Sequence, residues 1–176
     1  MAKLRKMLGK ADSIYIESLM RAVETQSKET IAKWCLDYAE EFILPIFENH
    51  CPEDGRPRMA ITASREWFEG KKKLPEVKNI ILNECHAVAR ELEDDPIAQA
   101  AARACGQASA CFHTPTHSLG LAFYGAAAIA YERVGLNEKP EVYDELASEV
   151  CREMERALGE ISIANEENPA KIKWNC

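Results

Sequence analysis

Two of the four histidines, His113 and His117, lie four residues apart in the sequence CFHTPTH. In a continuous helix this spacing places two imidazoles on one face, as in many helical metal sites. However, Pro115 interrupts the helix between them, and no glutamate follows His113 as it does in the HExxH pattern. His86 could supply a third nitrogen. We therefore interpret His86, His113 and His117 as a buried polar or ligand cluster, and we expect no bound metal.

Nucleophilic catalysis has weaker support in the sequence. Cys111 could pair with His113 or His117, and Ser118 with His117, but neighbours on one helix rarely present both groups to one substrate. No glycine loop that could form an oxyanion hole stands beside them. Adjacent carboxylates point apart on a helix and identify no acid–base couple. The glycine patterns of phosphate-binding and dinucleotide-binding loops are also absent. We therefore expect no catalytic residue and no cofactor, and these observations favour a protein that is not an enzyme.

The elements that must position these residues are helices. Apolar residues recur at steps of three and four, and no stretch shows the alternation of a strand. The clearest stripe in the N-terminal half contains Ile31, Trp34, Cys35, Tyr38, Ala39, Phe42, Ile43 and Ile46. Helix ends are predicted by a cap at Ser27, the pair Asp95-Pro96, the stop Gly135 and the start Pro140. The sequence therefore predicts an all-α, single-domain bundle of about seven helices.

The most apolar run, from Ala104 to Tyr131, predicts the central hairpin of this bundle. Its many alanines and glycines thin the helix surfaces, so that neighbouring backbones can approach closely. Between the two halves, we expect Thr114 to cap the second helix and Pro115 to be its first residue. The histidine pair then lies at the turn of the hairpin.

A charged loop is predicted between Glu48 and Arg58 (ENHCPEDGRPR), because the segment holds two prolines and an Asp-Gly pair. Loops on a rigid scaffold often carry function, although most charged loops are only solvated. Its position between two predicted helices makes it a candidate contact region.

The composition suits one domain, residues 1–176, with an N-terminal extension at 1–11 and a tail at 165–176 that docks on the bundle through Trp174. The net charge of −7 argues against a dedicated nucleic-acid binder, because such proteins collect Lys and Arg. We expect no secretory signal, no membrane span and therefore a cytoplasmic protein. The seven cysteines form no CxxC pair, so we expect reduced thiols.

Four segments carry a family resemblance: Trp34–Phe47 (WCLDYAEEFILPIF), Pro52–Ala60 (PEDGRPRMA) with Trp67 following, His86–Arg90 (HAVAR) and Ala101–Gly120. They are similar to the Imm-5-like family of bacterial immunity proteins. Members share a Trp-led helix, a PED-x-RPR-type loop and an alanine-rich AHxxxH-like segment, matched here by CFHTPTH with Phe112 where Ala is often written. The resemblance covers most of the chain. It implies an all-helical domain that protects a bacterial cell from a toxin by binding and blocking it.

On this interpretation the mechanism is occlusion, and the candidate partner-binding residues are Glu53, Asp54, Arg56, Arg58 and Trp67. Alternatively, Arg56 and Arg58 pair with acids of the loop or of a neighbouring helix and only pin the loop. An acidic surface would suit a basic nuclease toxin, with neither a nucleic acid nor a membrane as partner. The alternative function is a small helical metal- or ligand-binding protein that uses His86, His113 and His117, and a homo-oligomeric module also stays open.

Overall fold

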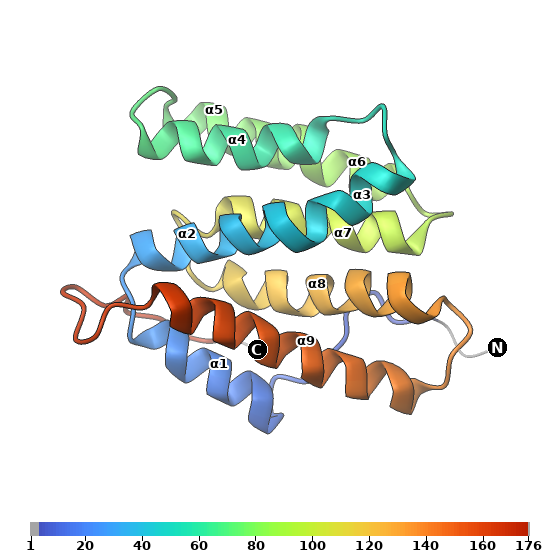
Figure 1. Ribbon diagram of the computed structural model, residues 1–176. Coiled ribbons are helices and arrows are strands. Elements are labelled where there is room, and N and C mark those ends of the chain that lie inside the picture. Colours follow the sequence, from blue (N-terminus) through green and yellow to red (C-terminus); the bar gives the residue numbers. More distant parts are fainter. Residues whose placement is uncertain (1–3, 176) are drawn as a thin grey trace.

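Two helices, α7 (Pro96–Ala110) and α8 (His117–Val134), form the centre of the computed structural model, which describes residues 4–175 (Figure 1). Their facing surfaces are built from buried alanines, among them Ala101, Ala104 and Ala126. Small side chains let the two backbones approach closely, so these helices pack against each other more extensively than any other pair. The predicted small-residue hairpin is therefore confirmed.

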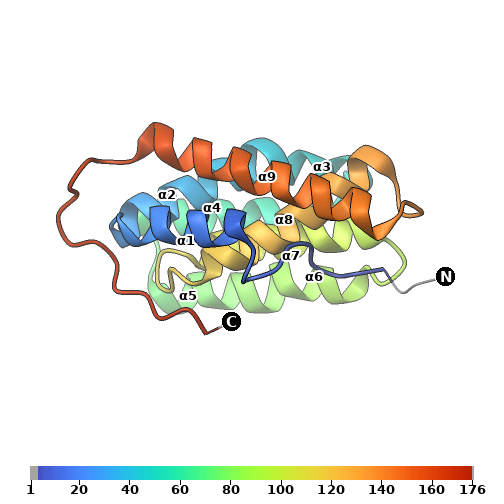
Figure 2. The ribbon, with the colours of Figure 1, turned by 90° about the horizontal axis from the view of Figure 1, so that it is seen from below.

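The other helices surround this hairpin (Figures 1 and 2). On one side lie α4 (Arg56–Phe68) and a long helix made of α5 (Leu74–Ile80), η2 (Ile81–Cys85) and α6 (His86–Glu91). On the other side lie α1 (Ile14–Glu24) and α9 (Pro140–Ile161), and a second long helix packs across the hairpin. That helix consists of α2 (Lys28–Tyr38), η1 (Ala39–Ile43) and α3 (Leu44–His50). Residues 4–175 thus form seven continuous helical segments without a strand, as predicted.

Most predicted helix ends are found in the structure. The Ser27 hydroxyl accepts a hydrogen bond from Thr30 N at 3.2 Å, and the Asp95 carboxylate accepts one from Ala98 N at 3.0 Å. Gly135 ends α8 at φ 79°, a left-handed conformation that favours glycine. The predicted start of α8 is wrong by two residues: Thr116, not Thr114, precedes the helix, and Pro115 lies in the turn. The carbonyl of Pro115 accepts from both Ser118 N and Ser118 Oγ, which stabilises the turn at this position.

Two π-helical turns, η1 and η2, lie inside the long helices. In η1 the Leu44 N–H bonds to the carbonyl of Ala39, five residues back, just before Pro45. Proline has no N–H, and its ring clashes with the carbonyl four residues back in an α-helix. A wider turn relieves that clash, so the helix continues to His50 instead of ending at the proline.

The C-terminal segment crosses the surface beside α1 and α2. Ala170 N donates to Gln26 O at 2.8 Å, and Trp174 Nε1 donates to the Glu24 carboxylate at 2.6 Å. Within the described residues six cysteines are free thiols, while Cys176 lies outside them. Across residues 4–175, the helices are all too short or too polar to cross a membrane.

Candidate interaction surfaces

The charged loop between α3 and α4 is tied down by its arginines. Arg56 Nη2 lies 2.7 Å from the Asp54 carboxylate and 2.7 Å from that of Glu91 on α6. Hydrogen bonds from Arg56 hold the pKa of Asp54 below its usual range. Arg58 Nε lies 2.6 Å from the Glu48 carboxylate on α3. Both arginines are thus neutralised within the protein, while Glu53 is exposed.

Trp67 lies far from this loop, near the opposite end of α4. The loop precedes Arg56 at one end of α4, and Trp67 is eleven residues along it, about 16 Å away. The half-buried indole packs on Phe112, with ring centroids 4.6 Å apart, and Phe112 packs on His113 at 4.9 Å. The five candidate partner-binding residues therefore divide into two groups, and Trp67 belongs with the histidines.

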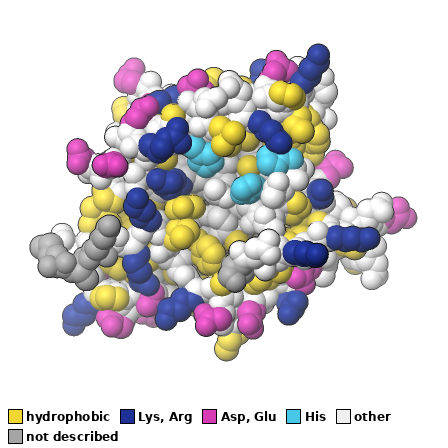
Figure 3. Space-filling model, turned by 180° about the vertical axis from the view of Figure 1, so that it is seen from behind, with side chains coloured by type: hydrophobic (Ala, Val, Ile, Leu, Met, Phe, Trp, Pro, Cys, Tyr) yellow, Lys and Arg dark blue, Asp and Glu magenta, His cyan; other side chains and the backbone are white. Residues whose placement is uncertain are grey.

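The three predicted cluster histidines share one face of the molecule. The rings of His113 and His117 lie 5.9 Å apart between centroids. His86 lies close enough to His117 for the two to interact electrostatically, and its ring occupies the space over Gly106 of α7. Figure 3 shows His side chains gathered on this face, with Lys and Arg around them and Asp and Glu mainly at the margin.

The three imidazoles are half-buried and only partly hydrogen-bonded. His117 Nδ1 lies 2.7 Å from Gln107 Oε1, and His113 Nδ1 lies 2.6 Å from the Thr114 hydroxyl. Burial lowers the pKa of each of the three, and Arg103 lowers that of His86 further. Within residues 4–175, no group of three or more His, Cys, Asp or Glu side chains is arranged to hold a metal ion.

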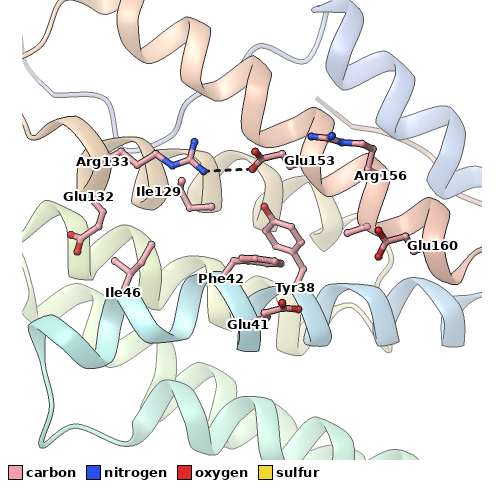
Figure 4. A pocket seen from close by; sticks show the side chains of 11 residues that line it. Tyr38, Glu41, Phe42, Ile46, Ile129, Glu132, Arg133, Glu153, Arg156 and Glu160 are labelled. Atoms are coloured by element: carbon pink, nitrogen blue, oxygen red, sulfur yellow. Dashed lines mark ion pairs between the residues drawn. The ribbon is translucent and has the colours of Figure 1, made fainter.

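A groove on another face was not anticipated from the sequence (Figure 4). It has a volume of ≈ 730 Å³ and lies between η1, α8 and α9. Tyr38 and Phe42 form an aromatic pair in it, with ring centroids 4.7 Å apart. Four carboxylates line it, those of Glu41, Glu132, Glu153 and Glu160, and they outnumber two arginines, Arg133 and Arg156. Arg133 lies 3.6 Å from the Glu153 carboxylate.

Phe42 reaches this groove because of the π turn. The apolar stripe of the sequence placed Phe42 in the core, but its side chain is 45% exposed. An α-helical turn advances 3.6 residues, whereas the wider turn of η1 holds more, which rotates the residues within it relative to the stripe. The signal that could have revealed this was Pro45, which the helix accommodates only with a local distortion.

A fourth histidine, His50, joins the groove to the loop. Its Nδ1 lies 2.8 Å from the Asp95 carboxylate and its Nε2 lies 2.9 Å from that of Glu132. These hydrogen bonds, the one to Glu132 first, raise the pKa of His50. Because Glu132 lines the groove and His50 directly precedes the loop, the two regions form one acidic face.

Comparison with known proteins identifies a family for this chain. Residues 21–157 match the family model described as Imm-5 like putative immunity protein. The chain belongs to this family. No curated protein and no solved structure matches the chain.

The Imm-5 like region contains most of the surfaces described above. It includes the charged loop, Trp67 and all three cluster histidines, together with every groove residue except Glu160. The first residues of α1 and the C-terminal segment lie outside it. Family membership therefore bears on both the acidic face and the histidine face.

Proposed function

We propose that this protein protects a bacterial cell by binding a cognate protein toxin in the cytoplasm and covering the toxin's active face, without any enzymatic step. Membership of the immunity protein family is the observation that carries this proposal.

The acidic face is the docking surface that we favour. The groove combines an exposed aromatic ring, Phe42, with four carboxylates that outnumber its two arginines. The exposed Glu53 extends the negative charge along the loop, whereas Asp54 is paired with Arg56. Lys or Arg side chains of a partner could pair with these carboxylates, and an aromatic face attracts a cation directly. We therefore infer a toxin whose contact segment is basic.

The loop arginines contribute to this surface by fixing its shape. Arg56 links the loop to α6 through Asp54 and Glu91, and Arg58 links α4 to α3 through Glu48. Binding to a rigid surface loses less conformational entropy than binding to a mobile loop. In this arrangement Arg56 and Arg58 position the face, while Glu53 and the groove residues contact the toxin.

The first experiment is co-expression of this protein with the toxin-like product of its neighbouring reading frame. We expect growth to be rescued and a stoichiometric complex to elute on size exclusion. The same column reports whether the free protein is a homo-oligomer. Neither rescue nor complex would reject the proposed function.

A pair of charge-reversal substitutions tests whether the groove is the docking surface, separately from whether the protein binds a toxin. Glu41→Lys with Glu160→Lys changes two groove residues that form no ion pair within residues 4–175. The matched control, Glu145→Lys with Glu167→Lys, makes the same change in charge at exposed positions outside the groove. We expect only the groove variant to lose rescue and complex. If both variants rescue equally, the groove is not the docking surface.

A further inference from the structure

The histidine face contains cationic and polar side chains that form no ion pair with a carboxylate of residues 4–175. His86 and Arg90 are four residues apart on α6, and Arg103 and Gln107 are four residues apart on α7, so each pair shares one side of its helix. His117 begins α8 and bonds to Gln107. Three helices thus bring these side chains together around Gly106.

Besides burial, cationic and imidazole groups lower the pKa of His86. The charged groups that act on it are Arg103, His117 and Arg90, and each lowers its pKa. The pKa of His113 is likewise lowered by burial first and then by the charges of Lys78, His117 and Lys28. No carboxylate of the described residues is among these neighbours, in a chain whose net charge is −7.

The arginines of this face are also unpaired. Neither Arg90 nor Arg103 forms an ion pair or a side-chain hydrogen bond with any residue from 4 to 175. Arg103 is half-buried, and its Cζ lies 5.7 Å from the centroid of the Tyr124 ring. Its Nε is buried and has no hydrogen-bond acceptor within residues 4–175. By contrast, Arg56, Arg58, Arg65 and Arg133 on other surfaces each contact carboxylates.

The hydrogen-bonding capacity of the imidazoles is only half used. His117 bonds through Nδ1, which leaves Nε2 without a partner, and neither nitrogen of His86 bonds within residues 4–175. A protonated imidazole donates through both nitrogens. A bound anion would stabilise that form, because it would compensate the cations around it.

We propose that His86, Arg90, Arg103 and His117 form a binding site for the phosphate group of a small ligand. Two guanidinium groups provide planar pairs of donors that match phosphate oxygens, and two imidazoles add protonatable donors. Their combined positive charge suits a doubly charged oxyanion better than a single carboxylate. Acidic side chains border the face and oppose an extended nucleic-acid backbone (Figure 3). The site lies on a different face from the groove and does not depend on the proposed toxin.

The test uses inorganic phosphate as the probe, with the full chain and isothermal titration calorimetry at low ionic strength. We expect saturable binding that Arg103→Gln weakens about tenfold or more, because charged hydrogen bonds are lost. Arg156→Gln is the matched control, since Arg156 lines the groove and has no ion pair within the described residues. The histidine ring resonances should report the location, shifting for His86 and His117 but not for His50.

Each alternative result overturns the assignment. No saturable binding, or equal weakening in both arginine variants, would reject the site. Acetate that binds as tightly as phosphate would reject a doubly charged ligand. A short RNA that binds far more tightly than phosphate, and depends on Arg103, would assign the face to a nucleic acid instead. Should Arg103→Gln fail to fold, His86→Gln serves as the second variant, with the same expected loss.

Discussion

The histidines of this protein occupy two contrasting environments. On the acidic face, His50 lies between the carboxylates of Asp95 and Glu132, and its pKa is raised. On the opposite side of the hairpin, His86 lies among cations and against α7, and its pKa is lowered. The same side chain is therefore held toward its protonated form in one region and its neutral form in the other.

The arginines divide in the same way. On the acidic face, the loop arginines Arg56 and Arg58 and the groove arginine Arg133 contact carboxylates. Arg156 of the groove is an exception, because it forms no ion pair within residues 4–175, and the same is true of Arg90 and Arg103 on the histidine face. The net charge of −7 does not reveal that cationic and acidic side chains gather on different faces. The comparison shows that one small helical bundle can present two surfaces of opposite electrostatic character, and the following changes test it.

The largest effect is expected for Phe42→Ala on toxin binding. An exposed aromatic anchor in a charged groove can contribute about 2 kcal/mol or more, so affinity should fall about thirtyfold or further. Leu82→Ala is the control, because Leu82 is 58% exposed and also lies in a π turn, η2. Both variants should fold normally by circular dichroism. Equal affinity losses in surface plasmon resonance would show that Phe42 is not an anchor for the toxin.

Gly106→Ala should act on the histidine face alone. A Cβ at this position would lie 2.5 Å from His86 Cε1, so the imidazole must move. We expect phosphate affinity to fall about tenfold while toxin binding is unchanged. Alanine also stabilises a helix by about 1 kcal/mol relative to glycine, which offsets part of the free-energy cost of the overpacking. Calorimetry and thermal unfolding measure the two effects separately, and unchanged phosphate binding would contradict the role of His86.

The two histidine environments should give opposite dependences of stability on pH. A raised pKa at His50 stabilises the fold fully below the unfolded value near 6.5, and this stabilisation is lost as pH rises through the folded pKa. A lowered pKa at His86 gives stability that is present above about pH 6.5 and lost as pH falls below it.

Relative to wild type, His50→Gln should therefore be more destabilised at pH 6 than at pH 9. His86→Gln should lose less stability than wild type between pH 7.5 and 5.5. Urea unfolding at these pH values provides the measurement, and parallel curves for both variants would contradict the assignment.

The smallest effect separates a paired from an unpaired arginine. Arg56→Gln removes its contacts with Asp54 and Glu91, and we expect a loss of about 1 kcal/mol or less because the pair is partly solvated. Arg90→Gln removes no ion pair within the described residues and should change stability by less than about 0.5 kcal/mol. Urea denaturation resolves the difference if it is present. A larger loss for Arg90→Gln would show that the histidine face is internally stabilised.

The fold was largely predictable because its signals are local. Periodic apolar residues, the caps at Ser27 and Asp95 and the stop at Gly135 act within one or two helical turns. The error at Pro115 concerns such a boundary: the predicted cap, Thr114, lies two residues before the observed one, Thr116, and helix ends are less well determined by local signals than helix interiors.

The surfaces were harder to predict, because they depend on contacts between distant segments. The grouping of the histidines required α6 to pack on α7, and the separation of Trp67 from its loop required the length of α4. The groove required a π turn that rotates Phe42 outward, and its carboxylates come from η1, α8 and α9. Spacing along the chain carries little information about such long-range arrangements.

The π turn of η1 also determines how this helix would respond to a change in chain length. Each i+5 hydrogen bond accommodates one residue more than an α-helical turn. Deleting Glu41 together with Pro45→Ala, which removes the ring that clashes in an α-helix, should therefore convert the turn to α-helix while α2 and α3 keep their places against the hairpin. Phe42 would then rotate, so the exposure of this ring is encoded by the number of residues before Pro45 as well as by their identity.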